Sequence, residues 1–354
     1  MIDKLLKLVI DTGSSDLHVA CNEPPILRTN GNLLRTDFAP FTPEQVEQLC
    51  FSFLNKEQAD FLTQNKEIDL SYGVEGLGRF RVNIYRDRFG YAAALRTITE
   101  TIPTLEQLKL PATTKDIAQL PRGLVLVTGP TGSGKSTTLA AIIDWINTHR
   151  DEHILTIEDP IEFIHKSKKS LINQRELGTN THSFSNALRS ALREDPDVIL
   201  IGEMRDLETI SLAVTAAETG HLVFGTLHTS SAATTIDRLI DVFPPEQQTQ
   251  IRIQLSSSLK AVVSQTLLKK KDGQGRCMAM EIMTVTPAIA NLIREGKTSQ
   301  IYSAIQTGRK EGMQTLEAAL ADLYKQGLVR IDDIVAKSSR VDQLKNLLGA
   351  EITV

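Results

Sequence analysis

The stretch Leu124-Val-Leu-Val-Thr-Gly-Pro-Thr-Gly-Ser-Gly-Lys-Ser-Thr137 joins an apolar run to a glycine-rich turn and then to the start of a helix. A short apolar run followed by a helix is typical of a strand in a parallel sheet. Glycine at Gly132 and Gly134 lets backbone N–H groups converge on an anion, because a Cβ atom there would be in the way. The helix N-terminus adds partial positive charge at the same place. The pattern therefore predicts a phosphate-binding loop.

Individual residues of this loop have distinct expected roles. Lys135 is expected to reach the β- and γ-phosphates of a nucleotide and to act in catalysis, and the Ser136 hydroxyl is suited to ligating Mg²⁺. By itself the loop predicts binding of ATP or GTP, and hydrolysis needs further groups. The residues expected to bind the nucleotide here are Gly129, Pro130, Thr131, Gly132, Ser133, Gly134, Lys135, Ser136 and Thr137.

Acidic residues directly follow two other apolar runs, in the segments Glu158-Asp-Pro-Ile-Glu162 and Gly202-Glu203. Ligands bind an open parallel sheet at the C-terminal ends of its strands, so both segments are expected at the edge that holds the loop. Glu203 suits the handling of Mg²⁺, directly or through water. The group from Glu158 to Glu162 is placed to polarise the attacking water. Together with the loop, these carboxylates predict an enzyme that hydrolyses ATP with Mg²⁺.

Two histidines flank a further apolar run over 222–227. His228 follows the run, so it is expected to point at the γ-phosphate and to report whether that phosphate is present. For His221, which precedes the run, a role at the nucleotide and a structural role are equally open. Arg205-Asp206 is expected to be a surface turn or a helix cap.

Arginines are dense in the first hundred residues. They form either a solvated basic face or, in part, a group that stabilises phosphate charge as arginine fingers do. These arginines are Arg79, Arg81, Arg86, Arg88 and Arg96.

Three regions are expected along the chain. Residues 1–98 are predicted to form a small α/β domain, with a helix beginning at Thr42-Pro-Glu-Gln45, where Thr is the N-cap, Pro the first helical residue and Gln the capping-box residue. The alternation over 79–85 predicts a strand with Phe80, Val82 and Ile84 on one face. Residues 99–122, which are rich in proline, are predicted to be a linker, and residues 123–354 an ATPase domain.

The ATPase domain is predicted to contain a largely parallel sheet. Its strands are expected over 124–128, 153–157, 198–201 and 222–227, and helices follow them, as in sheets covered on both faces. The final hundred residues are predicted to be mostly helical. The predicted fold class is therefore α/β, with a small N-terminal α/β domain and a larger ATPase domain that ends in helices.

Composition narrows the possible functions. The 354 residues carry a net charge of −4 with a sequence pI near 6.0, which argues against a protein built mainly to grip nucleic acid. No stretch approaches the ~20 apolar residues that span a bilayer, and the first residues lack the features of a secretory signal. We therefore expect a cytoplasmic protein that touches a membrane only through partners. Three scattered cysteines predict neither a disulfide framework nor a four-thiolate zinc site.

Four segments together resemble the secretion ATPases of type II and type IV systems. They are Gly129–Ser136, Thr156–Glu162, Ile201–Asp206 and Gly220–His228, which match the Walker A, aspartate, Walker B and histidine boxes of that family. The similarity covers nearly the whole chain and is greatest to the type IV pilus retraction ATPases. One departure is Ala290, in a late helix where retraction ATPases typically carry arginine. The apolar stripe of that helix, Ile289, Leu292 and Ile293, is kept.

The resemblance implies a PAS-like N-terminal domain joined to a RecA-like domain, assembled as a homohexameric ring. It implies that Glu162 is the general base, that Glu203 is the Walker B acid, and that Arg81 and Arg96 contribute to the nucleotide site from the N-terminal domain. ATP turnover would change how each N-terminal domain packs on a neighbour and would turn an inner-membrane platform protein that dismantles the pilus. The protein would then be cytoplasmic and peripheral at the inner membrane.

Sequence features also bear on four alternative functions. Extension and secretion ATPases of the family usually carry extra N-terminal domains and a four-cysteine metal insertion, which the scattered cysteines and the ~120 residues before the loop argue against. An accessory retraction paralogue stays open. A RecA-type DNA translocase is disfavoured by the acidic balance and by the lack of a basic and aromatic stripe. A module that binds nucleotide without hydrolysing it is disfavoured by the full set of acidic residues and histidines.

Overall fold

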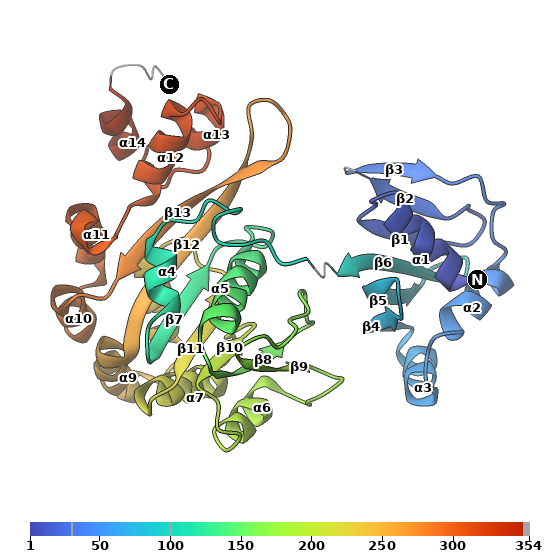
Figure 1. Cartoon of the computed structure of the whole chain (residues 1–354), viewed down its shortest axis with the longest axis horizontal. Helices are drawn as coiled ribbons and strands as arrows, with labels where there is room; N and C mark the ends of the chain where they lie inside the picture. Colours follow the sequence, from blue (N-terminus) through green and yellow to red (C-terminus); the bar gives the residue numbers. More distant parts are fainter. Residues whose placement is uncertain (30, 99–100, 350–354) are drawn as a thin grey trace. The chain divides into compact units, whose positions relative to one another are not determined.

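The computed structural model describes residues 1–29, 31–98 and 101–349, and the chain divides into two compact units (Figure 1). The first unit comprises Met1–Thr101 together with Glu162–Ile164, and the second comprises Ile102–Ile161 and His165–Val354. Each unit has its own apolar core. The description as PAS-like and the domain limits at 98 and 123 stay predictions.

The first unit is built on a six-stranded antiparallel sheet in the order β3-β2-β1-β6-β5-β4. The predicted alternation along β5 is confirmed, since Phe80, Val82 and Ile84 are fully buried. The predicted capping box at Thr42 and Gln45 is confirmed at the start of α2. The elements are α1 (Ile2–Asp11), β1 (Asp16–Val19), β2 (Ile26–Thr29), β3 (Asn32–Arg35), α2 (Pro43–Phe51), α3 (Lys56–Asn65), β4 (Glu67–Val74), β5 (Gly78–Arg86) and β6 (Tyr91–Ile98).

The second unit contains a seven-stranded sheet in the order β13-β12-β7-β11-β10-β8-β9. Every neighbouring pair is parallel except β12 and β13, so the predicted largely parallel sheet is confirmed. The predicted strands correspond to β7, β8, β10 and β11. The strands are β7 (Gly123–Thr128), β8 (His153–Glu158), β9 (Leu171–Glu176), β10 (Val198–Ile201), β11 (Leu222–Leu227), β12 (Leu259–Lys269) and β13 (Arg276–Thr284).

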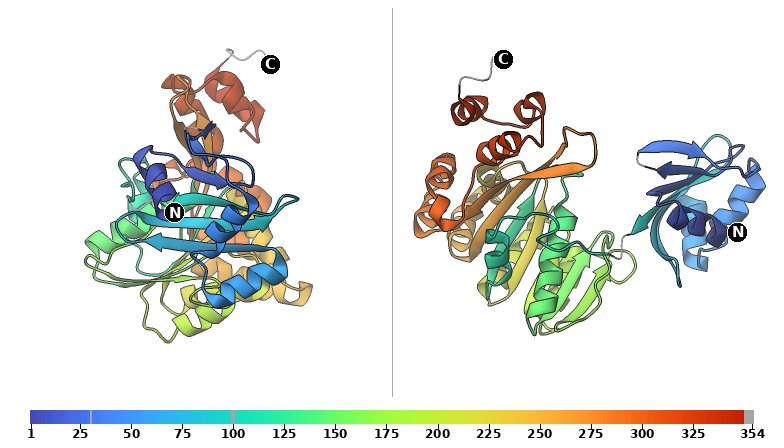
Figure 2. Two further views of the ribbon diagram at one scale, coloured as in Figure 1. Left: turned by 90° about the vertical axis from the view of Figure 1, so that its right-hand side faces the viewer. Right: turned by 45° about the horizontal axis from the view of Figure 1, so that its top comes forward.

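Helices cover both faces of this sheet (Figure 2). Alternate residues of β7 show the division, because Val125 and Val127 pack with α4 and α5, whereas Leu124 and Leu126 pack with the helices from α6 to α11. A strand buried on both faces is apolar throughout, which explains the unbroken apolar run of β7. The helices are α4 (Thr113–Ala118), α5 (Lys135–His149), α6 (Phe184–Ala191), α7 (Leu207–Glu218), α8 (Ala232–Asp241), α9 (Pro245–Ser258), α10 (Pro287–Arg294) and α11 (Ile301–Thr307).

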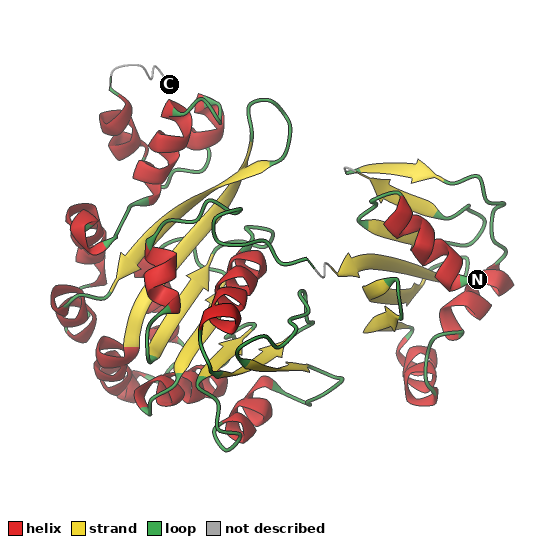
Figure 3. Ribbon diagram, viewed as in Figure 1, coloured by secondary structure: helices red, strands yellow, loops and turns green. Residues whose placement is uncertain are grey.

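The predicted helical C-terminal part is confirmed, but two strands that the prediction lacked, β12 and β13, precede its helices (Figure 3). They are the two longest strands of the sheet. Burial along β12 is nearly continuous rather than alternating, and polar residues from Ser264 to Thr266 interrupt its apolar residues. Periodicity alone does not separate such a strand from a buried helix. The helices α12 (Leu316–Lys325), α13 (Ile331–Val335) and α14 (Val341–Leu348) pack on the ends of these strands around Leu268 and Ala279.

The late helix keeps its expected packing. In α10, Ile289 and Ile293 are fully buried and Leu292 packs partly buried against the same core. None of the helices within residues 1–29, 31–98 and 101–349 is both long enough and apolar enough to cross a membrane.

The segment 99–122, expected to be a linker, is mostly folded onto the second unit. Residues 99 and 100 lie outside the described residues. Beyond them, Leu105, Ile117 and Ala118 are buried in one cluster with β7 and α5. The prolines therefore separate short packed segments instead of marking an extended connection.

A buried carboxylate on β13 makes the stability of the second unit depend on pH. Glu281 is 4% exposed and accepts a hydrogen bond of 2.7 Å from the N–H of Ala232, at the start of α8. Burial, reinforced by the nearby Glu317 carboxylate, raises the pKa of Glu281 from 4.5 to about 7. The folded chain thus keeps a proton that the unfolded chain releases. The stabilisation from this group is complete below pH 4.5 and is lost as the pH rises to about 7.

The variant Glu281→Gln should remove this dependence, because glutamine keeps an oxygen for the Ala232 N–H and does not ionise. We expect the difference in free energy of unfolding between the variant and the wild type to increase in favour of the variant by about 3 kcal/mol as the pH rises from 4.5 to 7. Above pH 7 this difference should stay constant. Denaturant unfolding at a series of pH values measures the difference. Glu311→Gln, at an exposed position of the same unit, is the control. Parallel pH profiles for wild type and Glu281→Gln would contradict the assignment.

Candidate active site

The phosphate loop connects the end of β7 to the start of α5. Gly129, Gly132 and Gly134 have φ values of 143°, 76° and 89°, a region that favours glycine. A Cβ atom on Gly129 would lie 2.3 Å from the backbone oxygen of Gln265, so no larger residue fits. A Cβ atom on Gly132 would meet no protein atom within 4 Å. Within the protein the requirement for glycine at Gly132 is therefore conformational.

Lys135 bends back over the loop. Its Nζ donates hydrogen bonds to the backbone oxygens of Gly129, at 2.9 Å, and Pro130, at 3.2 Å. Thr131 and Gly132 are exposed, whereas Ser136 and Thr137 are half-buried at the first turn of α5. The ammonium group thus lies on a loop whose tip is open to a ligand, beside the N-terminal end of a helix that favours negative charge.

Glu203 and His228 meet at the same sheet edge. His228 follows Leu227, which pairs with Thr128 at the end of β7. The His228 Nε2 lies 3.1 Å from Oε1 of Glu203. The Arg205 guanidinium binds both oxygens of the same carboxylate, with Nε 2.5 Å from Oε1 and Nη2 2.6 Å from Oε2. Partial burial opposes ionisation of Glu203, but Arg205, His228 and Lys135 outweigh it and hold the pKa of Glu203 below its usual range. Glu203 is therefore ionised at neutral pH.

The contact between Arg205 and Glu203 was missed by the sequence reasoning, which expected a surface turn or cap over 205–206. That expectation is confirmed for Asp206 alone, the N-cap of α7, whose carboxylate accepts from Thr209 N–H at 2.9 Å. The available signal was the spacing, because a single residue, Met204, separates these two oppositely charged residues in the sequence.

The structure does not bring His221 to the loop. It lies before the first residue of β11, while His228 lies after the last, and a strand of six residues spans roughly 20 Å. The Nδ1 of His221 is instead 2.9 Å from the backbone oxygen of Ala216, at the end of α7. Within one chain this geometry favours the structural role that the sequence left open.

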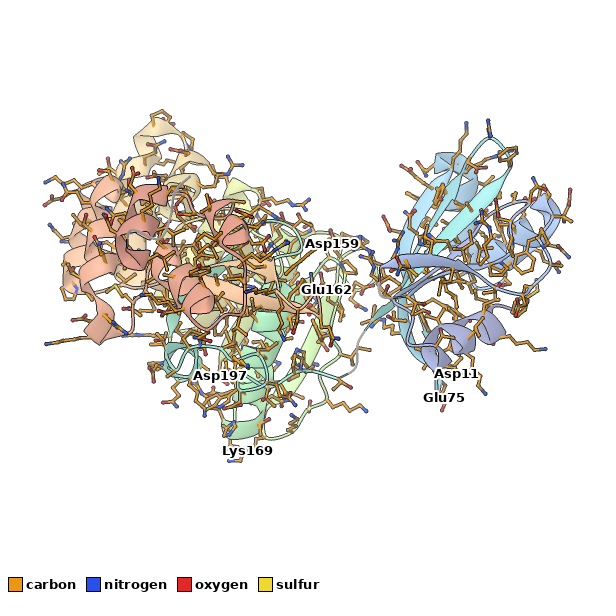
Figure 4. The ribbon with its side chains drawn as sticks, turned by 90° about the horizontal axis from the view of Figure 1, so that it is seen from above. Asp11, Glu75, Asp159, Glu162, Lys169 and Asp197 are labelled. Carbon is orange, nitrogen blue, oxygen red and sulfur yellow. The ribbon has the colours of Figure 1, made fainter. Side chains whose placement is uncertain are left out.

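The acidic segment after β8 contains carboxylates in different settings. Glu158 ends the strand, and its Oε1 accepts hydrogen bonds from Thr156 Oγ1 at 2.6 Å and from Gln174 Nε2 at 3.1 Å. Asp159 and Glu162 are exposed on the loop that follows (Figure 4). The Ile161 N–H, just before Glu162, donates to Glu176 Oε2 at 3.1 Å, which anchors the loop. Glu162 as general base stays a prediction.

Two of the candidate arginines lie side by side in the first unit. Arg81 on β5 is paired in register with Arg96 on β6, and Arg96 is paired with Asp16 on β1. The Nε of Arg96 donates to Asp16 Oδ1 at 2.8 Å, and Ser15 Oγ donates to Asp16 Oδ2 at 2.7 Å. Asp16 offsets the repulsion between paired like charges, a role that the sequence did not reveal. The reach of Arg81 and Arg96 to a nucleotide stays a prediction.

No group of three or more His, Cys, Asp or Glu side chains in the described part of the chain is arranged to hold a metal by itself. Mg²⁺ usually binds through one or two carboxylates together with substrate phosphates and water. The candidate metal residues Ser136 and Glu203, both oxygen donors, fit a cation that arrives with a nucleotide.

A family model described as Type II/IV secretion system protein matches residues 1–336. The chain belongs to this family. A curated relative, the type IV pilus retraction ATPase PilT of Pseudomonas aeruginosa, is 55% identical over 328 residues, 93% of this chain and 95% of that protein. The type IV pilus ATPase PilU of the same organism is 40% identical over 351 residues, 99% of this chain and 92% of that protein.

Among solved structures of secretion ATPases, the crystal structure of the pilus retraction motor PilT with bound ADP superposes with a TM-score of 0.92. The two sequences are 48% identical, and the superposition covers 97% of this chain and 98% of the PilT chain. The chain is an ATPase of the family, and its fold class, a parallel-rich sheet unit with an antiparallel N-terminal unit and a helical C-terminal part, is the one predicted. The predicted binding of nucleotide is likewise confirmed.

Proposed function

We propose that this chain is the motor ATPase that powers retraction of type IV pili, and with it twitching motility. The observation that carries the proposal is the similarity to PilT along almost the full length of both chains, at higher identity than to PilU. The phosphate loop, Glu203 and His228 supply the groups that such a motor needs to couple its movement to ATP.

In the proposed reaction, the loop amides and Lys135 bind the phosphates of ATP. Ser136 and Glu203 would hold Mg²⁺, which when bound neutralises charge on the β- and γ-phosphates. Glu162 orients the attacking water and accepts its proton, and His228 senses whether the γ-phosphate is present. Arg81 and Arg96 stabilise negative charge from the first unit.

The proposed working form is a homohexameric ring in the cytoplasm, peripheral at the inner membrane. It contacts an inner-membrane platform protein, and ATP turnover drives that protein by changing the packing between neighbouring subunits. Membrane contact is then entirely through partners, in keeping with the absence of a helix able to span the bilayer in the described part of the chain.

Deleting the gene tests the direction of the motor. We expect mutant cells to carry more surface pili than the parent and to lose twitching, because filaments continue to extend and are no longer withdrawn. Counting pili by electron microscopy and measuring twitching zones give the two readouts, and a plasmid copy of the gene should restore both. Fewer pili would show an extension motor instead.

The accessory paralogue is the second candidate, supported by the match to PilU over almost the entire chain. The same deletion separates the two. If the chain is an accessory motor, we expect part of the retraction to persist in the deletion strain, which optical-trap measurements of pulling force detect. Complete loss of retraction events in the deletion strain supports the main motor.

A further inference from the structure

Strand β12 extends past the end of β7 and runs beside the phosphate loop. Its Ser264 is in register with Thr128, the last residue of β7, and the two hydroxyls are 2.7 Å apart. The next residue of β12, Gln265, therefore lies level with the first residues of the loop. Its backbone oxygen is the atom that excludes any side chain from Gly129.

The side chain of Gln265 is bonded to the loop itself. It is 3% exposed, and its Nε2 donates a hydrogen bond of 2.8 Å to the backbone oxygen of Ser133. The same Nε2 would lie 3.3 Å from a Cβ atom placed on Gly134. The amide thus contacts the segment that joins the loop to α5.

The other half of this amide has no partner. Gln265 Oε1 is buried and has no hydrogen-bond partner among the described residues. The same is true of Oγ of Ser133, a residue of the loop. A buried polar atom without a partner destabilises a fold, and an apolar side chain of similar length would avoid this. The packing of the strand alone does not account for glutamine at this position, whereas the hydrogen bond to the loop does.

The bond to Ser133 fixes the direction of a neighbouring N–H. In a planar trans peptide the carbonyl of one residue and the N–H of the next point in opposite directions. Holding the Ser133 carbonyl against Gln265 therefore turns the Gly134 N–H away from β12. Gly134 has a positive φ, which glycine adopts without the steric penalty of other residues, so the hydrogen bond to Ser133 adds a restraint on this peptide group that the backbone itself does not supply.

We propose that Gln265 is a positioning residue for ATP binding: its amide holds the Ser133 carbonyl so that the Gly134 N–H faces the phosphates before the nucleotide arrives. Preorganised donors bind an anion more tightly because no reorganisation accompanies binding. The inference rests on the proposed nucleotide site at the loop and not on the role in pilus retraction.

The test is Gln265→Met, which keeps the volume of the side chain and removes the donor. We expect the Kd for ADP and the KM for ATP to rise about tenfold, the effect of losing one hydrogen bond of ordinary strength, while kcat changes less than about twofold. Hydrogen exchange in the peptide covering residues 129–137 of the nucleotide-free protein should become faster. The melting temperature should change little, because the variant also removes the unpaired Oε1.

Ser264→Ala is the matched control. It removes the adjacent buried hydrogen bond between β12 and β7 without touching the loop carbonyl, so we expect normal Kd and KM values with a lower melting temperature. A Gln265→Met protein with normal Kd, KM and exchange would overturn the proposal, and so would an equal loss of affinity in Ser264→Ala.

Measuring ADP binding by Lys135→Ala in parallel separates two kinds of failure. If Lys135→Ala binds weakly and Gln265→Met binds normally, only the role of Gln265 is wrong. If both variants bind normally, the phosphates do not lie at this loop.

Discussion

Replacing Lys135 by alanine should lower ATP turnover at least about a hundredfold, the usual loss when one preorganised group is removed from a developing negative charge. The Nζ of Lys135 already lies over the loop, 2.9 Å from the Gly129 oxygen. Without it, neither the loop amides nor the end of α5 supplies a full positive charge at that place. Release of inorganic phosphate by purified protein measures the effect.

Two controls accompany this variant. Lys169→Ala removes an exposed lysine of the same unit and should keep normal turnover, which excludes a general effect of charge. The melting temperature of Lys135→Ala should stay close to that of the wild type, because Lys135 is not part of the apolar core. Hydrolysis near the wild-type rate in a folded Lys135→Ala protein would remove the basis for placing the phosphates at this loop.

Glu162→Gln should bind ATP normally and lose turnover by a factor of about 100 or more, as expected when a general base is removed. Glutamine keeps the size and polarity of the side chain but does not accept a proton from water. Asp159→Asn changes a second exposed carboxylate of the same loop and should retain most of the activity. Single-turnover hydrolysis with ATP already bound separates the chemical step from binding.

Glu203→Gln distinguishes the base from the acid that handles the metal. The carboxylate of Glu203 is held between Arg205 and His228, so its loss should raise the Mg²⁺ concentration needed for half-maximal turnover. Glu162→Gln should leave that concentration unchanged. An active Glu162→Gln protein beside an inactive Glu203→Gln protein would reverse the two roles.

The central part of the fold was predictable because its signals are local. The apolar run, glycines and helix start from Leu124 to Thr137 follow one another in sequence, and each needs only its neighbours to adopt its conformation. The capping box at Thr42 and the alternation at Phe80, Val82 and Ile84 are local in the same way. These predictions agree with the structure.

The strands β12 and β13 were not predictable by the same reasoning. Buried polar residues such as Ser264, Gln265 and Glu281 interrupt their apolar pattern. The pairing that makes β12 a strand comes from β7, more than a hundred residues earlier in the chain, and β13 in turn pairs with β12. The burial of residues within the predicted linker, 99–122, was not predictable for a similar reason. Its prolines are visible in the sequence, whereas the burial of Leu105 and Ile117 depends on α5 and β7.

The sequence also did not predict which side chains meet across neighbouring strands. Asp16 beside Arg96 depends on the register of β1 against β6, and the place of His221 depends on which end of β11 faces the loop. Neither is set by the residues next to it in the chain, because register and strand direction are properties of the assembled sheet.

The sequence by itself determined that a strand, a phosphate loop and a helix follow one another at Gly129–Ser136, and that carboxylates and a histidine end the neighbouring strands. Local backbone chemistry is sufficient for this, since glycine, lysine and serine act within a few residues of one another. Only the tertiary structure decided what surrounds the loop. It placed Glu203 between Arg205 and His228, and brought Gln265 against Ser133, because a sheet joins strands that lie far apart in the chain.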